Sequence, residues 1–200
     1  MAERKINIID ANTINAMNLY AKEVVRRAKR NLKIKKKIEG KNRVTDNTGD
    51  LAKSLSYKIV KTIRGLSIKY YSTKKYADFI EEGVQGSTSS YTSAKKSPFK
   101  FKKQNLAEGV VEEWINTKPI KLRDLKTNQF ISPTEQAKKQ ASFLIGRSIA
   151  NKGIAPRHYF KDAIEETKKR FVMNLSRGMI RDTFKTFKNI EDTKETKEKK

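Results

Sequence analysis

The residues that could carry chemistry are few and scattered in this chain. His158 is the only histidine, and it stands among aromatic residues in the sequence Pro-Arg-His-Tyr-Phe, with no carboxylate nearer than Asp162. A lone histidine beside aromatics more often packs or donates a hydrogen bond than acts in catalysis. Glu81 and Glu82 are adjacent, so on a helix they point about 100° apart and do not face each other. We therefore expect no catalytic residues.

Cofactor and metal motifs are also missing from the sequence. No GxxxxGK[ST] or GxGxxG phosphate-binding loop occurs, and the chain has no cysteine, which excludes disulfides and thiolate metal sites. Carboxylates from distant positions could still converge in the fold and hold metal ions, as in a nuclease. We expect no cofactor and no metal, with a metal-dependent nuclease as a less favoured alternative.

Positive charge is the strongest compositional signal. Lys and Arg number 46 against 22 Asp and Glu, which gives a formal net charge of +24. A balance of this kind indicates a polyanion or an acidic protein surface as partner. A lysine-rich proteome encoded by an AT-rich genome would produce the same excess without any binding.

One basic cluster is the candidate contact site. It occupies the end of a predicted amphipathic helix, residues 11–32, and the residues that follow. Its members are Arg26, Arg27, Lys29, Arg30, Lys33, Lys35, Lys36 and Lys37. They either contact a polyanion or acidic partner, or form a solvated helix face. Asp10 or Asn12 is expected to cap the helix.

A second basic segment combines lysine with phenylalanine. Five lysines surround Phe99 and Phe101 between residues 95 and 103. Such a composition can stack on single-stranded nucleic acid. The alternative, which we favour, is that the phenylalanines pack inward while the lysines face water.

The remaining pattern predicts an α+β fold. Leu55, Tyr57 and Ile59 alternate with polar residues, and so do Leu66, Ile68 and Tyr70, which predicts an antiparallel hairpin with one buried face. Residues 76–83 predict a short helix ended by glycine, residues 104–116 a second helix, and Ser132 with Pro133 the start of a third.

The end of the chain reads as a long helix. It is expected from about Phe160 onward, with Gly178 able to kink or divide it. We expect one domain over 1–188 and a disordered charged tail over 189–200. No secretory signal or transmembrane run is apparent, so a soluble chain without membrane contact is expected.

Four segments, in order, resemble the bacteriophage head–tail joining, or tail-completion, family. Residues 48–51 (Thr-Gly-Asp-Leu), followed by Ser54, are similar to the family's Thr-Gly-x-Leu-x-x-Ser start. Residues 76–83 resemble its Tyr-Ala-x-x-apolar-Glu-x-Gly turn. Residues 152–160 resemble the Pro-Arg-Pro-Phe entry into the last helix, with His158 in place of the second proline, and residues 162–166 resemble the start of that helix.

The resemblance implies a non-enzymatic structural protein of the phage virion. It implies a ring subunit of the neck that joins the portal to the tail and lines or seals the DNA channel. A homo-oligomer with six- or twelve-fold symmetry is expected, with portal or adaptor proteins and tail proteins as neighbours and packaged DNA as a sequence-independent contact. The protein would be made in the host cytoplasm and end in the virion. The alternative function is a sequence-independent nucleic-acid-binding protein.

Overall fold

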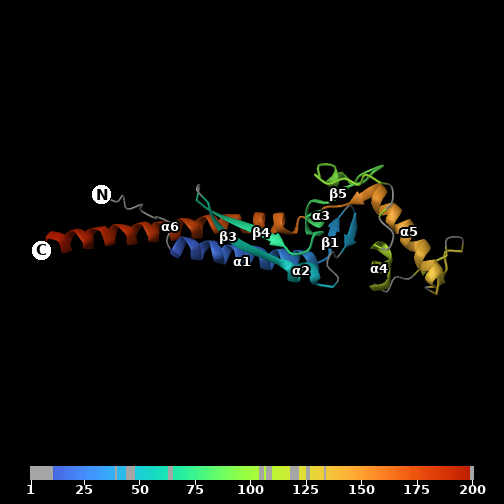
Figure 1. Cartoon of the computed structure of the whole chain (residues 1–200), viewed down its shortest axis with the longest axis horizontal. Coiled ribbons are helices and arrows are strands. Elements are labelled where there is room, and N and C mark those ends of the chain that lie inside the picture. Colours follow the sequence, from blue (N-terminus) through green and yellow to red (C-terminus); the bar gives the residue numbers. More distant parts are fainter. Residues whose placement is uncertain are drawn as a thin grey trace. The chain divides into compact units, whose positions relative to one another are not determined.

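The computed structural model describes residues 11–38, 40–43, 48–62, 65–103, 106, 110–117, 122–124, 127–132 and 134–198. Within them the chain is α+β, with a long first helix, a long last helix and antiparallel pairs of strands (Figure 1). The predicted fold class is confirmed. The chain separates into two compact units, the first made of 1–34, 44–75 and 159–200 and the second of 35–43 and 76–158. The expectation of a single domain over 1–188 stays a prediction.

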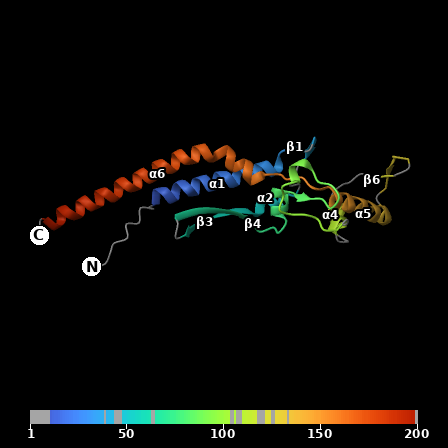
Figure 2. The ribbon, with the colours of Figure 1, turned by 90° about the horizontal axis from the view of Figure 1, so that it is seen from above.

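The first unit is built around helix α1 (Ala11–Lys33). Met17, Ala21, Val24, Ala28 and Leu32 recur at helical spacing and are all buried. This predicted apolar face is confirmed except at Ile14, which is 38% exposed while its neighbour Thr13 is buried. Helix α6 (Tyr159–Glu198) lies alongside α1 and runs in the opposite direction, since Thr13 contacts Asp182 and Asn31 contacts Tyr159 (Figure 2).

A hairpin covers another side of α1. Helix α2 (Asp50–Ser54) leads into strand β3 (Leu55–Thr62), which pairs antiparallel with β4 (Gly65–Ser72). The register places Tyr57 opposite Tyr70 and Ile59 opposite Ile68. Because alternate residues of a strand share a face, the predicted apolar set does lie on one side of the hairpin. Both strands contact α1.

Helix α6 is longer than helix α1, on which it packs. It is one continuous helix of 40 residues, so Gly178 does not divide it. Gly178 is instead where the two helices approach closely, because a Cβ there would lie 3.1 Å from the carbonyl oxygen of Asn12. The segment 189–200, expected to be a disordered tail, is helical as far as Glu198, and its lysines and glutamates favour helix.

The second unit consists of short elements. Helix α3 (Ala77–Glu82) comes first among the helices of this unit. Helices α4 (Val110–Thr117) and α5 (Glu135–Lys152) follow it and contact each other. The strands form antiparallel pairs, which are β1 (Lys36–Ile38) with β2 (Lys41–Arg43), β5 (Val84–Gln85) with β8 (Gly153–Ile154), and β6 (Leu122–Arg123) with β7 (Phe130–Ile131). A 3-10 turn covers Thr92–Ala94.

One predicted helix start in this unit differs from the structure, and another lies outside the described residues. Helix α5 is capped by Thr134, whose hydroxyl accepts a hydrogen bond from the Ala137 nitrogen, and not by Ser132. The Thr134 cap satisfies an N–H group of the first turn two residues later than expected. Helix α4 begins at Val110, and most of the residues predicted to precede it lie outside the described part of the chain.

Candidate interaction surfaces

The predicted basic cluster is spread over both units. Arg26, Arg27, Lys29, Arg30 and Lys33 lie on α1 in the first unit, whereas Lys35 precedes β1 and Lys36 and Lys37 lie on it in the second. The structure therefore does not unite the eight residues on one element. Lys33, Lys35 and Lys37 are exposed, and the Lys36 ammonium donates to the carbonyl oxygen of Arg157 at 3.4 Å.

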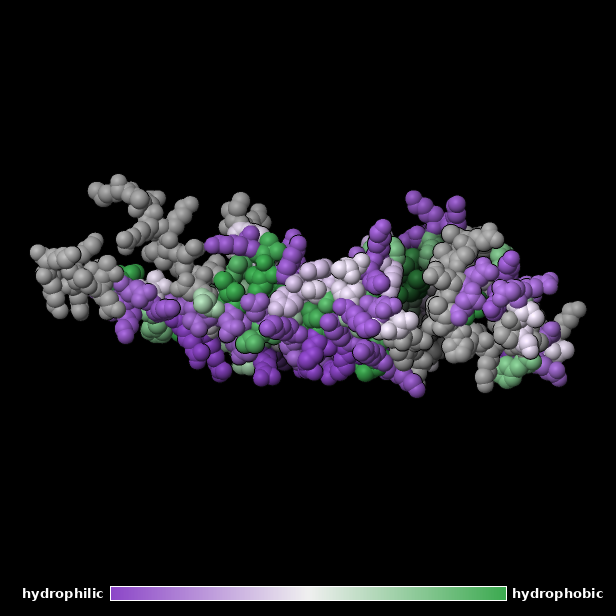
Figure 3. Space-filling view, turned by 60° about the horizontal axis from the view of Figure 1, so that its bottom comes forward, coloured by the Kyte–Doolittle hydropathy of each residue, from purple (hydrophilic) through white to green (hydrophobic). Residues whose placement is uncertain are grey.

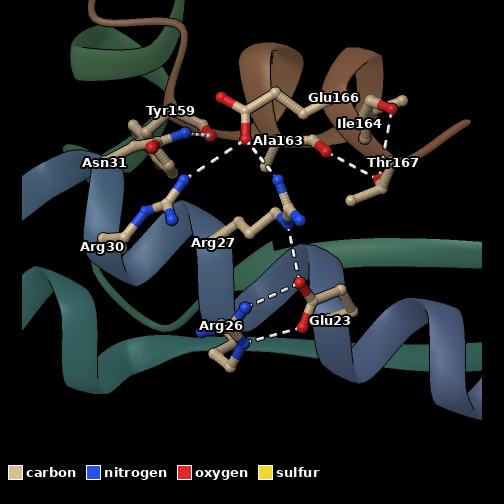
Figure 4. A network of polar contacts seen from close by, with 10 residues as sticks. All are labelled: Glu23, Arg26, Arg27, Arg30, Asn31, Tyr159, Ala163, Ile164, Glu166 and Thr167. Atoms are coloured by element: carbon tan, nitrogen blue, oxygen red, sulfur yellow. Dashed lines mark hydrogen bonds and ion pairs between the residues drawn. The ribbon is translucent and has the colours of Figure 1, made fainter.

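Two arginines of the cluster share a carboxylate on their own helix. Arg26 donates two hydrogen bonds to Glu23, each of 2.7 Å, and Arg27 donates one more of 2.7 Å (Figure 4). The spacing of three and four residues places all three side chains together on the helix surface. These hydrogen bonds, first from Arg26 and then from Arg27, lower the pKa of Glu23 to about 2.

A second carboxylate ties the cluster to the last helix. Glu166 of α6 accepts from Arg27 at 2.7 Å and from Arg30 at 3.3 Å (Figure 4). Close by, the Asn31 amide donates to the Tyr159 carbonyl oxygen. Three of the arginines predicted to contact a polyanion thus already pair with carboxylates of the same unit. Arg27 and Arg30 hold α1 against α6 through Glu166, whereas Arg26 pairs within α1.

The lysine and phenylalanine segment places its aromatic rings toward the protein. Phe99 meets Phe79 edge to face at 4.7 Å. The Phe99 carbonyl oxygen accepts a hydrogen bond from the nitrogen of Gln85 in β5, and the Phe101 nitrogen donates to the Gln85 carbonyl oxygen. Phe101 is half-buried. The favoured reading, with phenylalanine inward and lysine outward, agrees with this packing. The lysines of the segment are exposed, and none forms an ion pair with another described residue: Lys95, Lys96, Lys100, Lys102 and Lys103.

An apolar groove opens in the first unit between β4 and α6. It has a volume of about 440 Å³ and is lined from α1 by Met17 and Tyr20, from β4 by Ile68 and Tyr70, and from α6 mainly by Phe171. Tyr20 stacks on Phe171 at 3.9 Å along one wall. Burial raises the pKa of the Tyr70 phenol, whose oxygen has no hydrogen-bond partner within the described residues. Figure 3 shows one face of the molecule, on which hydrophobic side chains gather in patches among hydrophilic ones.

Two of the four segments with family-like motifs, residues 76–83 and 152–160, contact each other. Val84 pairs with Ile154, and the carbonyl oxygens of Ile80 and Glu81 accept hydrogen bonds from the nitrogens of Arg157 and His158. Gly83 has a φ of 74°, and a Cβ there would lie 2.6 Å from the Ile154 carbonyl oxygen. The glycine in the motif is thus required by both backbone conformation and space.

His158 has a structural explanation for its departure from the family pattern. Its φ of 52° lies in the left-handed region, which the proline ring cannot adopt and which histidine enters more readily than most residues. Its Nδ1 atom is buried and lacks a hydrogen-bond partner within the described residues. No group of three or more His, Asp or Glu side chains is close enough to hold a metal ion in the described part of the chain.

One buried residue that joins α1 to α6 was not identified from the sequence. Asp182 is fully buried, and its carboxylate accepts four hydrogen bonds from Asn12 and Thr13 at the start of α1. Burial by itself would raise the pKa of Asp182, but the hydrogen bonds from Thr13 and Asn12 outweigh it, so the pKa lies below its usual value. The available signal was that Asp182 is the one acidic residue between Glu166 and Glu191 of α6.

Comparison with known proteins bears on the elements just described. Residues 8–83 match the family model described as "Bacteriophage HK97-gp10, putative tail-component". The resemblance to phage head–tail proteins is confirmed. No curated protein and no solved structure matches the chain.

The HK97-gp10-like match covers less than half of the chain and runs from the start of α1 through the hairpin to the end of α3. It ends at Gly83, the glycine packed against Ile154. The match shows that residues 8–83 are similar to a family described as a putative bacteriophage tail component. None of the described helices is both long and apolar enough to cross a membrane.

Proposed function

We propose that this chain is a non-enzymatic ring subunit of the phage neck, which joins the portal to the tail and surrounds the DNA path. The observation that carries the proposal is the HK97-gp10-like match, whose limits coincide with a continuous set of elements from α1 to α3. The family-like motifs outside the match contact residues inside it. The nitrogens of Arg157 and His158 donate hydrogen bonds to the carbonyl oxygens of Ile80 and Glu81, and helix α6, which contains residues 162–166, packs on α1.

The ring itself is a six- or twelve-fold homo-oligomer in this proposal. Apolar surface supports assembly, because the groove between β4 and α6 remains open in the isolated chain. Large exposed apolar patches usually mark interaction sites. The portal or an adaptor would lie on one side of the ring and tail proteins on the other.

Two measurements test this proposal. Mass spectrometry of purified particles should find the chain in stoichiometric amount, and its absence from particles would refute the structural role. A cryo-EM map of the particle neck should then show the ring, its symmetry and its neighbours. Density for the chain elsewhere in the tail would support its assignment as a tail component but reject its position in the neck.

A second candidate is sequence-independent binding of nucleic acid. The exposed, unpaired lysines of residues 95–103 favour it, together with the net charge of +24. The contact would be with phosphates, since Phe99 packs on Phe79 and is not presented for stacking. DNA binding by the pure protein without particle incorporation would favour this candidate over the neck ring. Magnesium-dependent cleavage of DNA would instead point to a nuclease.

A further inference from the structure

Helix α6 carries a second apolar face that the chain leaves uncovered. Its packed face contains Ala163, Thr167 and Asp182, which are buried against α1. A second set of large side chains is 54 to 71% exposed: Met173, Ile180, Phe184 and Phe187. We call this set the α6 stripe.

The spacing of the α6 stripe is that of a helix–helix seam. Its members follow one another at intervals of seven, four and three residues. At about 100° per residue they fall within roughly 60° of each other, and roughly 140° around the axis from the packed face. A surface helix of a globular protein normally has one apolar face, toward its own core. Met179, Ile180, Thr183, Phe184 and Phe187 also line an indentation of about 260 Å³.

A basic row runs parallel to the α6 stripe along one flank. Its members follow at intervals of seven, four and seven residues and fall within roughly 40° of each other. They are Arg170, Arg177, Arg181 and Lys188, which we call the α6 basic row. All four are exposed, and none forms an ion pair with a described residue, unlike the arginines of α1. The other flank carries the neutral residues Ser176 and Thr183.

Charge decides what kind of partner fits this surface. In paired helices, the charges that flank an apolar seam select the partner and repel the wrong one. A second copy presenting the same face would add its own basic row to this one. DNA would use the basic row but gain nothing from Phe184 and Phe187. A helix lying in a membrane interface carries cations across its polar face, whereas between residues 170 and 188 of α6 they lie on one side of the stripe only.

We propose that the α6 stripe and the α6 basic row form a docking site for an acidic amphipathic helix of another protein. The partner helix has an apolar seam that covers Met173, Ile180, Phe184 and Phe187, and a row of Asp or Glu that faces the basic row. An apolar side chain of the seam enters the indentation beside Phe184. This inference goes beyond the neck assignment and does not depend on it, because it concerns binding by the purified chain.

The probes are two synthetic helical peptides with leucine along one seam. One carries glutamates along the flank of the seam, and the other carries lysines at the same positions. Fluorescence anisotropy with the full-length chain should show the acidic peptide binding at least about tenfold more tightly, equal to about 1.4 kcal/mol. Equal binding of the two peptides, or none, would overturn the proposal.

Variants separate the apolar and charged contributions. Phe184→Glu with Phe187→Glu should weaken the acidic peptide about tenfold or more. Reversal of the basic row to glutamate should invert the preference, so that the lysine peptide binds better. The matched control reverses four lysines of the other unit, Lys95, Lys96, Lys100 and Lys102, and should leave the preference unchanged. An equal loss in this control would show that only net charge matters and would reject the site.

Two further measurements examine the rival occupants. Sedimentation should show no self-association that depends on Phe184 and Phe187, since such dependence would assign the stripe to a second copy. Vesicles containing anionic lipid should not bind through the stripe and row, because binding there would assign the surface to a membrane. Circular dichroism and urea unfolding of each variant verify that the folded chain is being compared.

Discussion

Asp182 of α6 caps the first turn of α1 across the helix pair. One carboxylate oxygen accepts from both the backbone nitrogen and the hydroxyl of Thr13, at 2.8 and 2.6 Å. The other accepts from the nitrogen and side-chain amide of Asn12, at 3.3 and 2.7 Å. A negative charge at a helix N-terminus also interacts favourably with the helix dipole. The contact therefore fixes where α1 begins against α6.

Asp182→Ala should destabilise the chain by about 2 kcal/mol or more. The change removes a cap and leaves the buried donors of Thr13 without an acceptor. Urea unfolding followed by circular dichroism measures the effect. Glu191→Ala, at an exposed position of the same helix, is the control and should change stability little. A loss in Asp182→Ala no larger than in Glu191→Ala would contradict the role given to this carboxylate.

Stability should fall with acid between about pH 4.5 and pH 2. The pKa of Glu23 drops from 4.5 to about 2 on folding, so its stabilising contribution is present above pH 4.5 and is lost as pH falls through 2. Glu23→Gln should flatten this part of the profile of urea midpoint against pH.

The dependence on salt should distinguish the stabilising contribution of Glu23 from that of Asp182. Glu23 pairs at the surface, so high salt should reduce its contribution. Asp182 is buried, so the contribution measured with Asp182→Asn should persist in high salt. Equal sensitivity of both contributions to salt would argue against this difference in environment.

Gly83→Ala should destabilise the chain more than Gly40→Ala. Both glycines have nearly the same φ, 74° and 76°, so both changes carry a similar backbone cost of about 1 kcal/mol. Only at Gly83 does the new Cβ meet other atoms, at 2.6 Å from Ile154 and 2.8 Å from Pro156, whereas nothing lies within 4 Å of it at Gly40. The added overpacking should cost about 1 to 3 kcal/mol more, measured by urea unfolding. Similar losses at both sites would count against close packing at this junction.

Charge reversal in the basic cluster should separate stability from partner contact. Arg27→Glu should lower stability by about 1 kcal/mol, since it breaks pairs with Glu23 and Glu166, and Glu166→Arg in the same chain should recover part of that loss. Lys33→Glu should leave stability unchanged, because Lys33 is exposed. If the cluster contacts DNA or an acidic neighbour, Lys33→Glu combined with Lys29→Glu should lower the yield of DNA-filled particles. Wild-type yield would leave the cluster as a solvated surface.

Any DNA affinity should depend steeply on salt and not on sequence. Each phosphate neutralised should contribute about 0.9 log units of affinity per log unit of salt. Reversal of Lys100, Lys102 and Lys103 to glutamate should reduce that slope if these exposed lysines make the contact. The affinity of the pure protein for duplexes of different sequence, measured over a range of salt, tests this. Affinity that varies with base sequence would contradict a phosphate-only contact.

Local periodicity was enough to determine the main elements. The apolar spacing of α1, the alternation in β3 and β4, and the glycine stop at Gly83 all depend on residues close in sequence. Side chains at helical or strand spacing share a face whatever the rest of the chain does. The resemblance to phage head–tail proteins likewise rested on short motifs in order, and residues 8–83 bear it out.

Tertiary structure alone decided the partners of the polar and charged groups. The sequence offered Asp10, which lies outside the described residues, or Asn12 as the cap of α1, and could not show that Asp182, far along the chain, places a carboxylate there. The sequence predicted that the arginines of α1 contact a polyanion, whereas Glu166 of the antiparallel helix α6 already pairs with two of them. Periodicity marked α6 as helical but did not tell which of its apolar residues would be covered, and the α6 stripe became visible only once α1 had occupied the other face. Contacts between distant residues depend on how helices dock, and short-range patterns carry no information about docking.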